Sequence, residues 1–433
     1  MRVILSIGHG RLHLISSAFW IAKAGVSVRL ICGWVPQAAN GLLVRTASRL
    51  VGRDLSPGFR KRVITQPNCE VCSCAMAEWI DQFMRLCCRI FHFPMRLVSS
   101  LGWRLFGWQS CRFIKGADIF HCRSGAGRGG AIKKAKRLGM KVVVDHSIAH
   151  PAFMDKQLRS EYEKNGAPFD LGLDSPFWRQ IVKDCEESDV VLVNSTFVRD
   201  TFLENGFDPE KIRVVYLGQR DDFLGLRHPK SGEDNQMALR LLFSGGFGFR
   251  KGGEYILSAL KILKQRGIPF IMDVVGDYSS ARTLISKYED GLDIQFGGSF
   301  ESQCALDSRT GIGKVIFHGP KPQDELKLYL AAGDVYVFPS LAEGCAQSGM
   351  EAMAAGLCVI GTHESGFPIT DGENGCLVSC KNAYAIADKI EWLDKNRGEI
   401  DRMGENATRL VRENFTWRRY AENVKSLYEE LMR

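Results

Sequence analysis

Short apolar runs alternate with amphipathic segments along the whole chain, and this rhythm limits the possible folds more than any other feature of the sequence. Most runs are followed by polar or Gly-rich residues and then by a helical pattern, which is typical of parallel strands joined by helices. The expected strands are residues 3–7, 26–31, 119–121, 142–145, 190–194, 213–216, 241–244, 270–275, 315–318, 335–338 and 358–361. Because both halves repeat this order, the sequence predicts an α/β protein with two Rossmann-like sheets in tandem.

The length of 433 residues also favours two domains, because a single hydrophobic core rarely extends beyond about 250–300 residues. A polar, turn-forming stretch near the middle of the chain indicates where the domains join. We expect an N-terminal domain over residues 1–218, a linker over 219–238, a C-terminal domain over 239–414 and a terminal segment over 415–433. Two domains imply a cleft between them.

Composition points to a soluble globular protein, with 45% hydrophobic and 24% charged residues. No stretch of about 18 apolar residues is present, which argues against a transmembrane helix. The first residues resemble a buried strand more than a signal peptide. We therefore expect a cytoplasmic protein.

The 14 cysteines are scattered, and most are expected to be free and buried thiols. Cys69 and Cys72 have the spacing of zinc ligands and lie near Cys74, Cys87 and Cys88. No second pair completes a tetrahedral set. We therefore expect no metal site.

Charge is distributed unevenly, although the net charge of the whole chain is only +8. Residues 1–150 contain 23 Lys and Arg against 6 Asp and Glu, a net charge of +17, whereas residues 151–433 carry −9. A basic N-terminal domain would attract anionic lipid headgroups, a phosphorylated acceptor or nucleic acid. A solvated basic face without a partner is the alternative interpretation.

Residues 75–115 interleave aromatic and basic side chains, a pattern that suits a protein lying peripherally on the inner face of a membrane. Pro94 is expected to split the segment into two helices. An ordinary helical pair packed on the first sheet, with its arginines reaching outward, explains the pattern equally well. Nucleic acid is not an expected partner, because no known reader motif is present.

The stretch YVFPSLAEGCAQSGMEAMAAG is the most informative for function. A buried strand ends at a Pro-Ser turn, and a loop then delivers Glu343 ahead of a small-residue helix that carries Glu351. Ligands of α/β proteins bind at this carboxyl end of the strands. The two carboxylates, eight positions apart, are placed to grip hydroxyl groups at opposite ends of a diphosphate. The backbone amides near Gln347, Ser348 and Gly349 would face that diphosphate from the helix start.

A second cluster, GGFGFRKGG, follows the first expected strand of the C-terminal half and opens a helix. Its backbone amides, including that of Gly246, and the ammonium of Lys251 can neutralise a pyrophosphate leaving group, with Arg250 as a further cation. Gly276 and Gly319 end two later strands, where they would let the backbone approach a base or a ribose. Plain strand-to-loop turns explain these two glycines equally well.

The N-terminal half contributes fewer candidates. Gly8 and Gly10 follow the first strand and are placed to present their amides to the cleft. His146 ends a later strand beside Asp145, at the sheet edge where ligands bind. His150 is a weaker competitor for the same role.

The E-x7-E spacing of Glu343 and Glu351 after a Pro-Ser turn closely resembles the signature of the retaining glycosyltransferases of family 4, which have the GT-B fold. Similarity to that family extends over most of the chain. It includes residues 185–197, 275–277, 317–320 and 415–417. The resemblance implies two Rossmann-like domains facing across a cleft, with a last helix that crosses back to the first domain.

The resemblance also implies roles for individual residues. Glu343 would contact the donor sugar, and Glu351 would contact the ribose of the nucleotide. Lys251 would stabilise the departing phosphate, and His146 would face the donor sugar.

One position departs from the family pattern. The family normally has an arginine five or six residues before the matching lysine, and this chain has Gly245 and Gly246 there. Arg250 is the candidate replacement for the second phosphate cation.

The function implied by the resemblance is transfer of a sugar from a nucleoside diphosphate to an acceptor hydroxyl with retention at the anomeric carbon. No cofactor or metal is expected, and same-face attack assisted by the diphosphate is the expected mechanism, since no enzymic nucleophile stands out. The expected partners are a nucleotide sugar and a sugar or lipid-linked acceptor, as in glycolipid or surface-polysaccharide synthesis. A phosphorylase or nucleotide-sugar epimerase on the same fold, or a non-catalytic nucleotide-sugar-binding membrane protein, are the alternatives.

Overall fold

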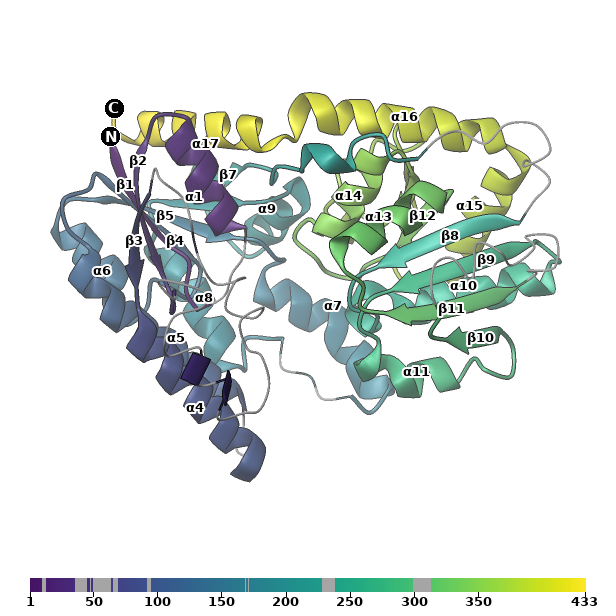
Figure 1. Cartoon of the computed structure of the whole chain (residues 1–433), viewed down its shortest axis with the longest axis horizontal. Coiled ribbons are helices and arrows are strands. Elements are labelled where there is room, and N and C mark those ends of the chain that lie inside the picture. Colours follow the sequence, from purple (N-terminus) through teal and green to yellow (C-terminus); the bar gives the residue numbers. More distant parts are fainter. Residues whose placement is uncertain are drawn as a thin grey trace.

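The computed structural model describes residues 1–9, 13–35, 45–46, 48–49, 64, 69–91, 95–167, 169, 171–227, 238–298 and 313–433. In these residues the strands form two seven-stranded sheets, and all paired strands run parallel. Figure 1 shows the two sheets side by side, each flanked by helices. The predicted α/β fold with two Rossmann-like domains is therefore confirmed.

The first sheet has the strand order β3-β2-β1-β4-β5-β6-β7. Its strands are β1 (Arg2–Ser6), β2 (Ser27–Cys32), β3 (Cys69–Ser73), β4 (Ile119–Arg123), β5 (Lys141–His146), β6 (Val190–Val193) and β7 (Ile212–Val214). The helices of this half are α1 (Leu14–Lys23), α4 (Ala75–Phe91), α5 (Met95–Ser110), α6 (Ala131–Arg137), α7 (Pro151–Lys164), α8 (Pro176–Glu187) and α9 (Thr196–Leu203).

The second sheet has the order β10-β11-β9-β8-β12-β13-β14. Its strands are β8 (Leu239–Ser244), β9 (Phe270–Val275), β10 (Asp293–Phe296), β11 (Lys314–Gly319), β12 (Val335–Phe338), β13 (Cys358–Gly361) and β14 (Cys376–Leu377). The helices that follow β7 are α10 (Gly253–Gln265), α11 (Arg282–Ser286), α13 (Gln323–Ala332), α14 (Gln347–Ala355), α15 (Ala383–Lys395), α16 (Arg397–Asn414) and α17 (Trp417–Leu431).

Strand β5 shows why the apolar runs become strands. Val142 and Val144 pack into one hydrophobic core, whereas Val143 packs into another. Successive side chains of a strand point to opposite faces of the sheet. A run that is apolar at every position therefore fits a central strand that is covered on both faces.

Three strands of the structure were not predicted, and all three lie at sheet edges. They are β3, β10 and β14, with the sequences CEVCS, DIQF and CL. An edge strand pairs with only one neighbour, so it needs no continuous apolar run. The signal that identified the central strands is therefore missing from these three.

The cysteines considered as zinc ligands lie in and beside β3. Cys69 packs on one core of the N-terminal domain, whereas Cys72 and Cys74 are buried in the other. Burial also raises the pKa of Cys74 to about 12. Because Cys69 and Cys72 point to opposite faces of a strand, they do not converge on one metal ion.

The aromatic and basic segment over residues 75–115 forms a helical pair. Helix α4 ends at Phe91 and α5 begins at Met95, so the predicted break is confirmed, although Pro94 itself lies outside the described residues. Arg85 of α4 bonds to Asp81 on its own helix at 2.7 Å and donates to Ser99 Oγ of α5 at 3.5 Å.

The last helix connects the two halves of the molecule. Helix α16 lies over the second sheet, and α17 continues from it to the first, so that both chain termini lie close together (Figure 1). Ser17 Oγ of α1 donates to the Tyr420 hydroxyl at 3.0 Å. The Tyr428 hydroxyl lies 2.6 Å from His121 Nδ1. The terminal helix is thus held by buried polar contacts with the N-terminal domain.

The expected linker is anchored to the second half along part of its length. Phe223 is fully buried in the core of the C-terminal domain. The amides of Gly225 and Arg227 donate to the carbonyls of Ala354 and Ala355 at 2.9 and 2.8 Å. The domain boundaries at 218 and 238 stay predictions.

Candidate functional site

The loop after β8 contains the predicted diphosphate cradle. It turns through Gly245, whose φ of +124° favours glycine. A Cβ built on Gly245 or Gly246 would have its nearest neighbours, Ser348 Oγ and Asp277 O, at 3.9 and 4.0 Å, and one on Gly248 would have none within 4 Å. The loop therefore leaves open space beside its backbone, as close approach of a phosphate requires.

Lys251 and Arg250 end this loop in a short 3-10 helix, η5 (Phe249–Lys251). Both form ion pairs with the carboxylate of Glu343, which comes from the loop between β12 and α14. Arg250 also donates to Ala342 O at 3.0 Å. Glu343 itself is only 8% exposed. The structure thus brings three of the predicted site residues into direct contact.

Burial and charge act in opposite directions on Glu343. Burial raises its pKa, but Lys251 and Arg250 lower it by more, so the pKa lies below its ordinary value. Burial lowers the pKa of Lys251, and Arg250 adds to this, whereas the carboxylate of Glu343 opposes the shift. The three groups form one cluster in which the buried carboxylate of Glu343 neutralises two half-buried cations.

The two domains meet at the residue after Glu343. A Cβ on Gly344 would lie 2.1 Å from Ser147 O and 2.6 Å from Asn194 Oδ1, both in the N-terminal domain. Ser195 Oγ donates to Gly344 O at 2.6 Å. Only glycine permits this approach, so the loop that carries Glu343 is clamped against the ends of β5 and β6.

Glu351 lies on α14 at the other end of the Gly-rich loop. The Tyr336 hydroxyl donates to Ser348 Oγ at 2.9 Å, and Ser348 is the nearest neighbour of Gly245 across the loop. No hydrogen bond or ion pair joins Glu351 to the described residues. Burial raises its pKa to about 7, with Arg220 lowering it and Asp222 raising it. This carboxyl group is free to bond to ligand hydroxyls.

We expect Glu351→Gln to stabilise the protein at pH 8 and to change little at pH 5. The native state keeps the proton of Glu351 up to about pH 7, whereas the unfolded chain releases it near its ordinary pKa of about 4.3. The free energy of unfolding therefore falls as the pH rises between these values. Thermal melts at both pH values measure the difference, with a gain of a few degrees expected at pH 8.

The exposed Glu289, which has no ion pair among the described residues, provides the matched control. Glu289→Gln should leave the melting temperature unchanged at both pH values. If Glu351→Gln changed the melting temperature equally at pH 5 and pH 8, the raised pKa of Glu351 would be contradicted.

The start of α14 differs from the expected row of free amides. The amide of Gly349 already donates to Ala346 O at 3.1 Å. A Cβ on Gly349 would lie 2.0 Å from the ring of Phe367, so this glycine is required by packing. Gln347 accepts a bond of 2.8 Å from Gln219 through its side chain. Gln347 and Ser348 thus line the helix start, whereas Gly349 serves the core.

Gly276 directly follows β9 and lies against the Gly-rich loop. Its φ is +144°, and a Cβ there would lie 2.0 Å from Gly245 O. The close approach is therefore between two loops of the protein. Gly319, with φ of +72°, has no heavy atom within 4 Å of its Cβ position, and it stays a candidate for ligand approach.

Gly8, which follows β1, packs against an aromatic side chain. A Cβ on Gly8 would lie 2.2 Å from the ring of Trp103, and the φ of Gly8 is +80°. Packing under Trp103 explains this glycine. Gly10 lies outside the described residues.

His146 is at the carboxyl end of β5 but is fully enclosed by the N-terminal domain. Its Nδ1 is 2.9 Å from Ser124 Oγ, and its ring packs edge-on against Phe202. Burial lowers its pKa to about 3, so the imidazole is neutral. The adjacent Ser147, through its carbonyl, contacts Gly344. The strand end reaches the Glu343 loop, while the imidazole ring points into the domain core.

A buried polar cluster at the same sheet edge was not predicted from the sequence. His13 Nε2, at the start of α1, is 3.0 Å from Asp145 Oδ1. Burial raises the pKa of Asp145, but His13, His121 and Arg123 lower it below its ordinary value. Asp145 follows an apolar run on β5 and was visible in the sequence, but its partner lies 132 residues away.

Two further features of the described residues concern metal ions and membranes. They contain no group of three or more His, Cys, Asp or Glu side chains placed to hold a metal ion. None of the helices described combines the length and the apolar composition that crossing a bilayer requires.

Two family models match successive parts of the chain. The model described as glycosyl transferases group 1 matches residues 227–410, which include Lys251, Glu343 and Glu351. The model described as glycosyltransferase family 4 matches residues 70–222. Together they account for most of both domains.

Individual proteins give a consistent result. A D-inositol 3-phosphate glycosyltransferase of Corynebacterium diphtheriae is 27% identical over 256 residues, 56% of this chain and 56% of that protein. The amylovoran biosynthesis glycosyltransferase AmsK of Erwinia amylovora is 29% identical over 223 residues, 50% of this chain and 49% of that protein. The chain thus matches about half the length of these curated relatives.

The fold is matched over its full length. The Anabaena protein HepE, solved in complex with UDP-glucose, has a TM-score of 0.57 and 14% sequence identity, with 99% of this chain and 100% of that chain covered. With its two parallel sheets and the two family models in succession, the chain resembles the family 4 glycosyltransferases along most of its length and shares their GT-B fold.

Proposed function

We propose that the protein transfers a sugar from a nucleoside diphosphate to an acceptor hydroxyl with retention of the anomeric configuration. The observation that supports this most directly is the cluster of Lys251, Arg250 and Glu343 at the end of an open Gly-rich loop. Two cations beside accessible backbone suit a diphosphate leaving group. HepE, which has the same fold, was solved with a nucleoside diphosphate sugar, UDP-glucose.

In this proposal the diphosphate of the donor displaces Glu343 from the two cations. Lys251 and Arg250 then stabilise the negative charge that develops on the leaving phosphate, which is the interaction that must be stronger in the transition state. The released Glu343 carboxylate binds hydroxyls of the donor sugar. Glu351 at the far end of the loop binds the ribose. Arg250 takes the place of the arginine that the family has at Gly245 or Gly246.

Among the described residues, the thiol closest in sequence to this cluster is not suited to act as an enzymic nucleophile. Cys345 follows Glu343 by two residues, but burial and the carboxylate of Glu343 raise the pKa of its thiol far above its ordinary value. A thiol that stays protonated is a poor nucleophile. We therefore propose same-face attack, with the departing diphosphate accepting the proton of the acceptor hydroxyl.

We also propose that the acceptor is lipid-linked or part of a surface polysaccharide and that the N-terminal domain is peripheral on a membrane. Helix α4 exposes a stripe of large apolar side chains at helical spacing. Trp79, Phe83 and Ile90 are 56%, 66% and 59% exposed. An amphipathic helix of this kind, in a domain with a net positive charge, suits an anionic bilayer surface.

The test of retention needs no acceptor other than water. The purified chain is first screened by thermal shift against UDP-, GDP- and ADP-sugars, since a ligand that binds only the folded state raises its stability. The slow hydrolysis of the best α-linked donor is then followed by NMR. Release of the α-anomer first would support retention, whereas release of the β-anomer first would contradict it.

The same assay separates the alternatives. Conversion of the sugar nucleotide to an isomer without release of nucleotide would indicate an epimerase. Sugar phosphate formed only with added phosphate would indicate a phosphorylase. Tight nucleotide binding without donor consumption, with acceptors supplied, would indicate a binding protein. Each of these results would contradict the proposed transfer.

A further inference from the structure

A large hollow lies in the N-terminal domain outside the donor site. It has a volume of about 830 Å³ and lies between α5, α8 and the Gly-rich loop that joins β4 to α6. All of its lining residues fall between positions 100 and 187. The residues proposed to bind the donor through their side chains, from Arg250 to Glu351, therefore contribute nothing to it.

Four exposed cations surround this hollow without protein partners. They are Arg104 of α5, Lys133 of α6, and Arg179 and Lys183 of α8. Across the described residues, the structure gives none of these four side chains a hydrogen bond or an ion pair. The only carboxylate in the lining is Glu187, which bonds in bidentate fashion to Arg128 at 2.8 and 3.2 Å. The hollow therefore has an uncompensated positive charge.

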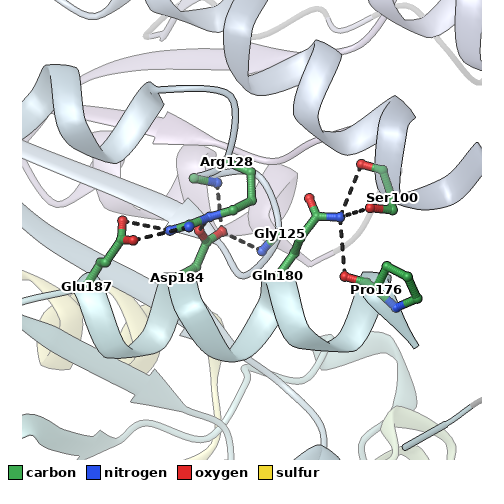
Figure 2. A network of polar contacts seen from close by, with 8 residues as sticks. Ser100, Gly125, Arg128, Pro176, Gln180, Asp184 and Glu187 are labelled. Atoms are coloured by element: carbon green, nitrogen blue, oxygen red, sulfur yellow. Dashed lines mark hydrogen bonds and ion pairs between the residues drawn. The ribbon is translucent and has the colours of Figure 1, made fainter. Parts of the chain in front are cut away.

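The Gly-rich wall of the hollow is held by a buried carboxylate. Asp184 accepts hydrogen bonds from the amides of Gly125 and Gly127 at 2.7 and 2.9 Å and also pairs with the Arg128 guanidinium. Figure 2 shows Asp184 on α8 facing this loop, with Arg128 lying between Asp184 and Glu187. The network fixes the loop and also Arg128, which is the cation of the described lining that already has ion pairs.

The α5 wall is fixed equally tightly. A Cβ on Gly107 would lie 1.8 Å from Arg128 O, and one on Gly129 would lie 2.0 Å from Arg104 O. Gln180 of α8 bonds to both the carbonyl and the hydroxyl of Ser100 on α5 (Figure 2). Because these walls are already ordered, little conformational entropy is lost when a ligand binds.

Exposed apolar side chains border the cations. Leu101 and Trp108 line the hollow and are 54% and 59% exposed. They lie on the same helix as Arg104, at helical spacing that puts all three on one face. The hollow thus offers positive charge and apolar surface together, which matches an anionic group attached to an apolar body.

We propose that this hollow is a binding site for a phosphate group, carried by an anionic amphiphile whose apolar part contacts Leu101 and Trp108. Lysine and arginine are the side chains that bind phosphate oxygens through charge-assisted hydrogen bonds. The site is separate from the proposed donor site and does not depend on it. A lipid headgroup in a bilayer and a soluble phosphorylated compound share this chemistry, and the experiment separates them.

The test compares two charge-matched double variants of the full chain. Arg179→Gln/Lys183→Gln removes two unpaired cations from the hollow. Lys136→Gln/Lys141→Gln removes two exposed cations from the same domain, and neither residue lines the hollow. All four positions are exposed, so both variants should fold, which thermal melting verifies.

Binding is measured on vesicles of phosphatidylglycerol and phosphatidylcholine, on vesicles of phosphatidylcholine alone, and by calorimetry with soluble glycerol 3-phosphate. The Arg179/Lys183 variant should bind the anionic vesicles about twentyfold more weakly than the wild type, and the control variant should lose much less. If the Arg179/Lys183 variant loses only glycerol 3-phosphate binding and keeps its vesicle binding, the phosphate site is supported but the amphiphilic ligand is overturned. Equal losses in the two variants for every probe would overturn the proposal.

Discussion

Lys251→Ala is expected to lower turnover of the sugar-nucleotide donor by about a hundred- to a thousandfold. The Lys251 ammonium is half-buried in the cluster at the end of the Gly-rich loop, where a leaving diphosphate would develop negative charge. A preorganised charge aimed at such a group typically contributes this much to catalysis. Steady-state kinetics with the best donor from the thermal-shift screen measures the loss, which should fall mainly on kcat.

The exposed Lys264 at the end of α10 provides the control for this variant. Lys264→Ala should keep normal turnover. Lys251→Ala leaves Glu343 paired with Arg250, so the variant should still fold, and its melting curve verifies this. Near-normal turnover in folded Lys251→Ala would refute the role of Lys251 in stabilising the leaving group.

Glu343→Gln is expected to have two opposite effects, lower turnover and tighter binding of the free nucleoside diphosphate. In the structure the Glu343 carboxylate neutralises Lys251 and Arg250, so a diphosphate has to displace it. The side chain of glutamine has the same shape as that of glutamate but no charge, so it competes less strongly with the diphosphate for the two cations. Because a hydrogen bond to a charged group contributes roughly 1.5–3 kcal/mol, we expect about tenfold tighter binding of the nucleoside diphosphate of the best donor from the screen, measured by calorimetry.

Stability gives a second measurement on the same variant. Removing the charge of Glu343 leaves two half-buried cations without their counter-ion, and the cost should lie below the roughly 3–5 kcal/mol of breaking a fully buried pair. Glu343→Gln should therefore melt at a lower temperature than the wild type, and the same nucleoside diphosphate should raise the melting temperature of the variant more than that of the wild type. Weaker binding of the nucleoside diphosphate by Glu343→Gln would show that the carboxylate assists diphosphate binding and does not compete with it.

Much of the candidate site could be predicted from the sequence because its signals are local. The Gly-rich loop before Lys251 and the spacing of Glu343 and Glu351 lie within short stretches, next to apolar runs that predict strands. Parallel strands bring such stretches to one sheet edge. The contact among Glu343, Lys251 and Arg250 agrees with that expectation, while the roles of these residues stay predictions.

The interpretation of single glycines and of His146 depended on more than the local sequence. Gly8 and Gly349 pack against Trp103 and Phe367, and Gly276 packs against the backbone of Gly245. A glycine that approaches a ligand and one that approaches a distant part of the same chain look identical in sequence. His146 likewise follows a strand as expected, but its ring points into the core, because Ser124 and Phe202 from other elements enclose it.

Apolar runs and turn residues alone were sufficient to place the central strands, the helical pair around Pro94 and the loops that bear Lys251 and Glu343, because hydrophobic periodicity is set by neighbours within a few positions. Two features were decided only when the chain folded, namely the edge strands and the His13–Asp145 pair. Each of these depends on groups brought together across many residues. Their energies come from burial and from charges at short distance, which no local pattern records.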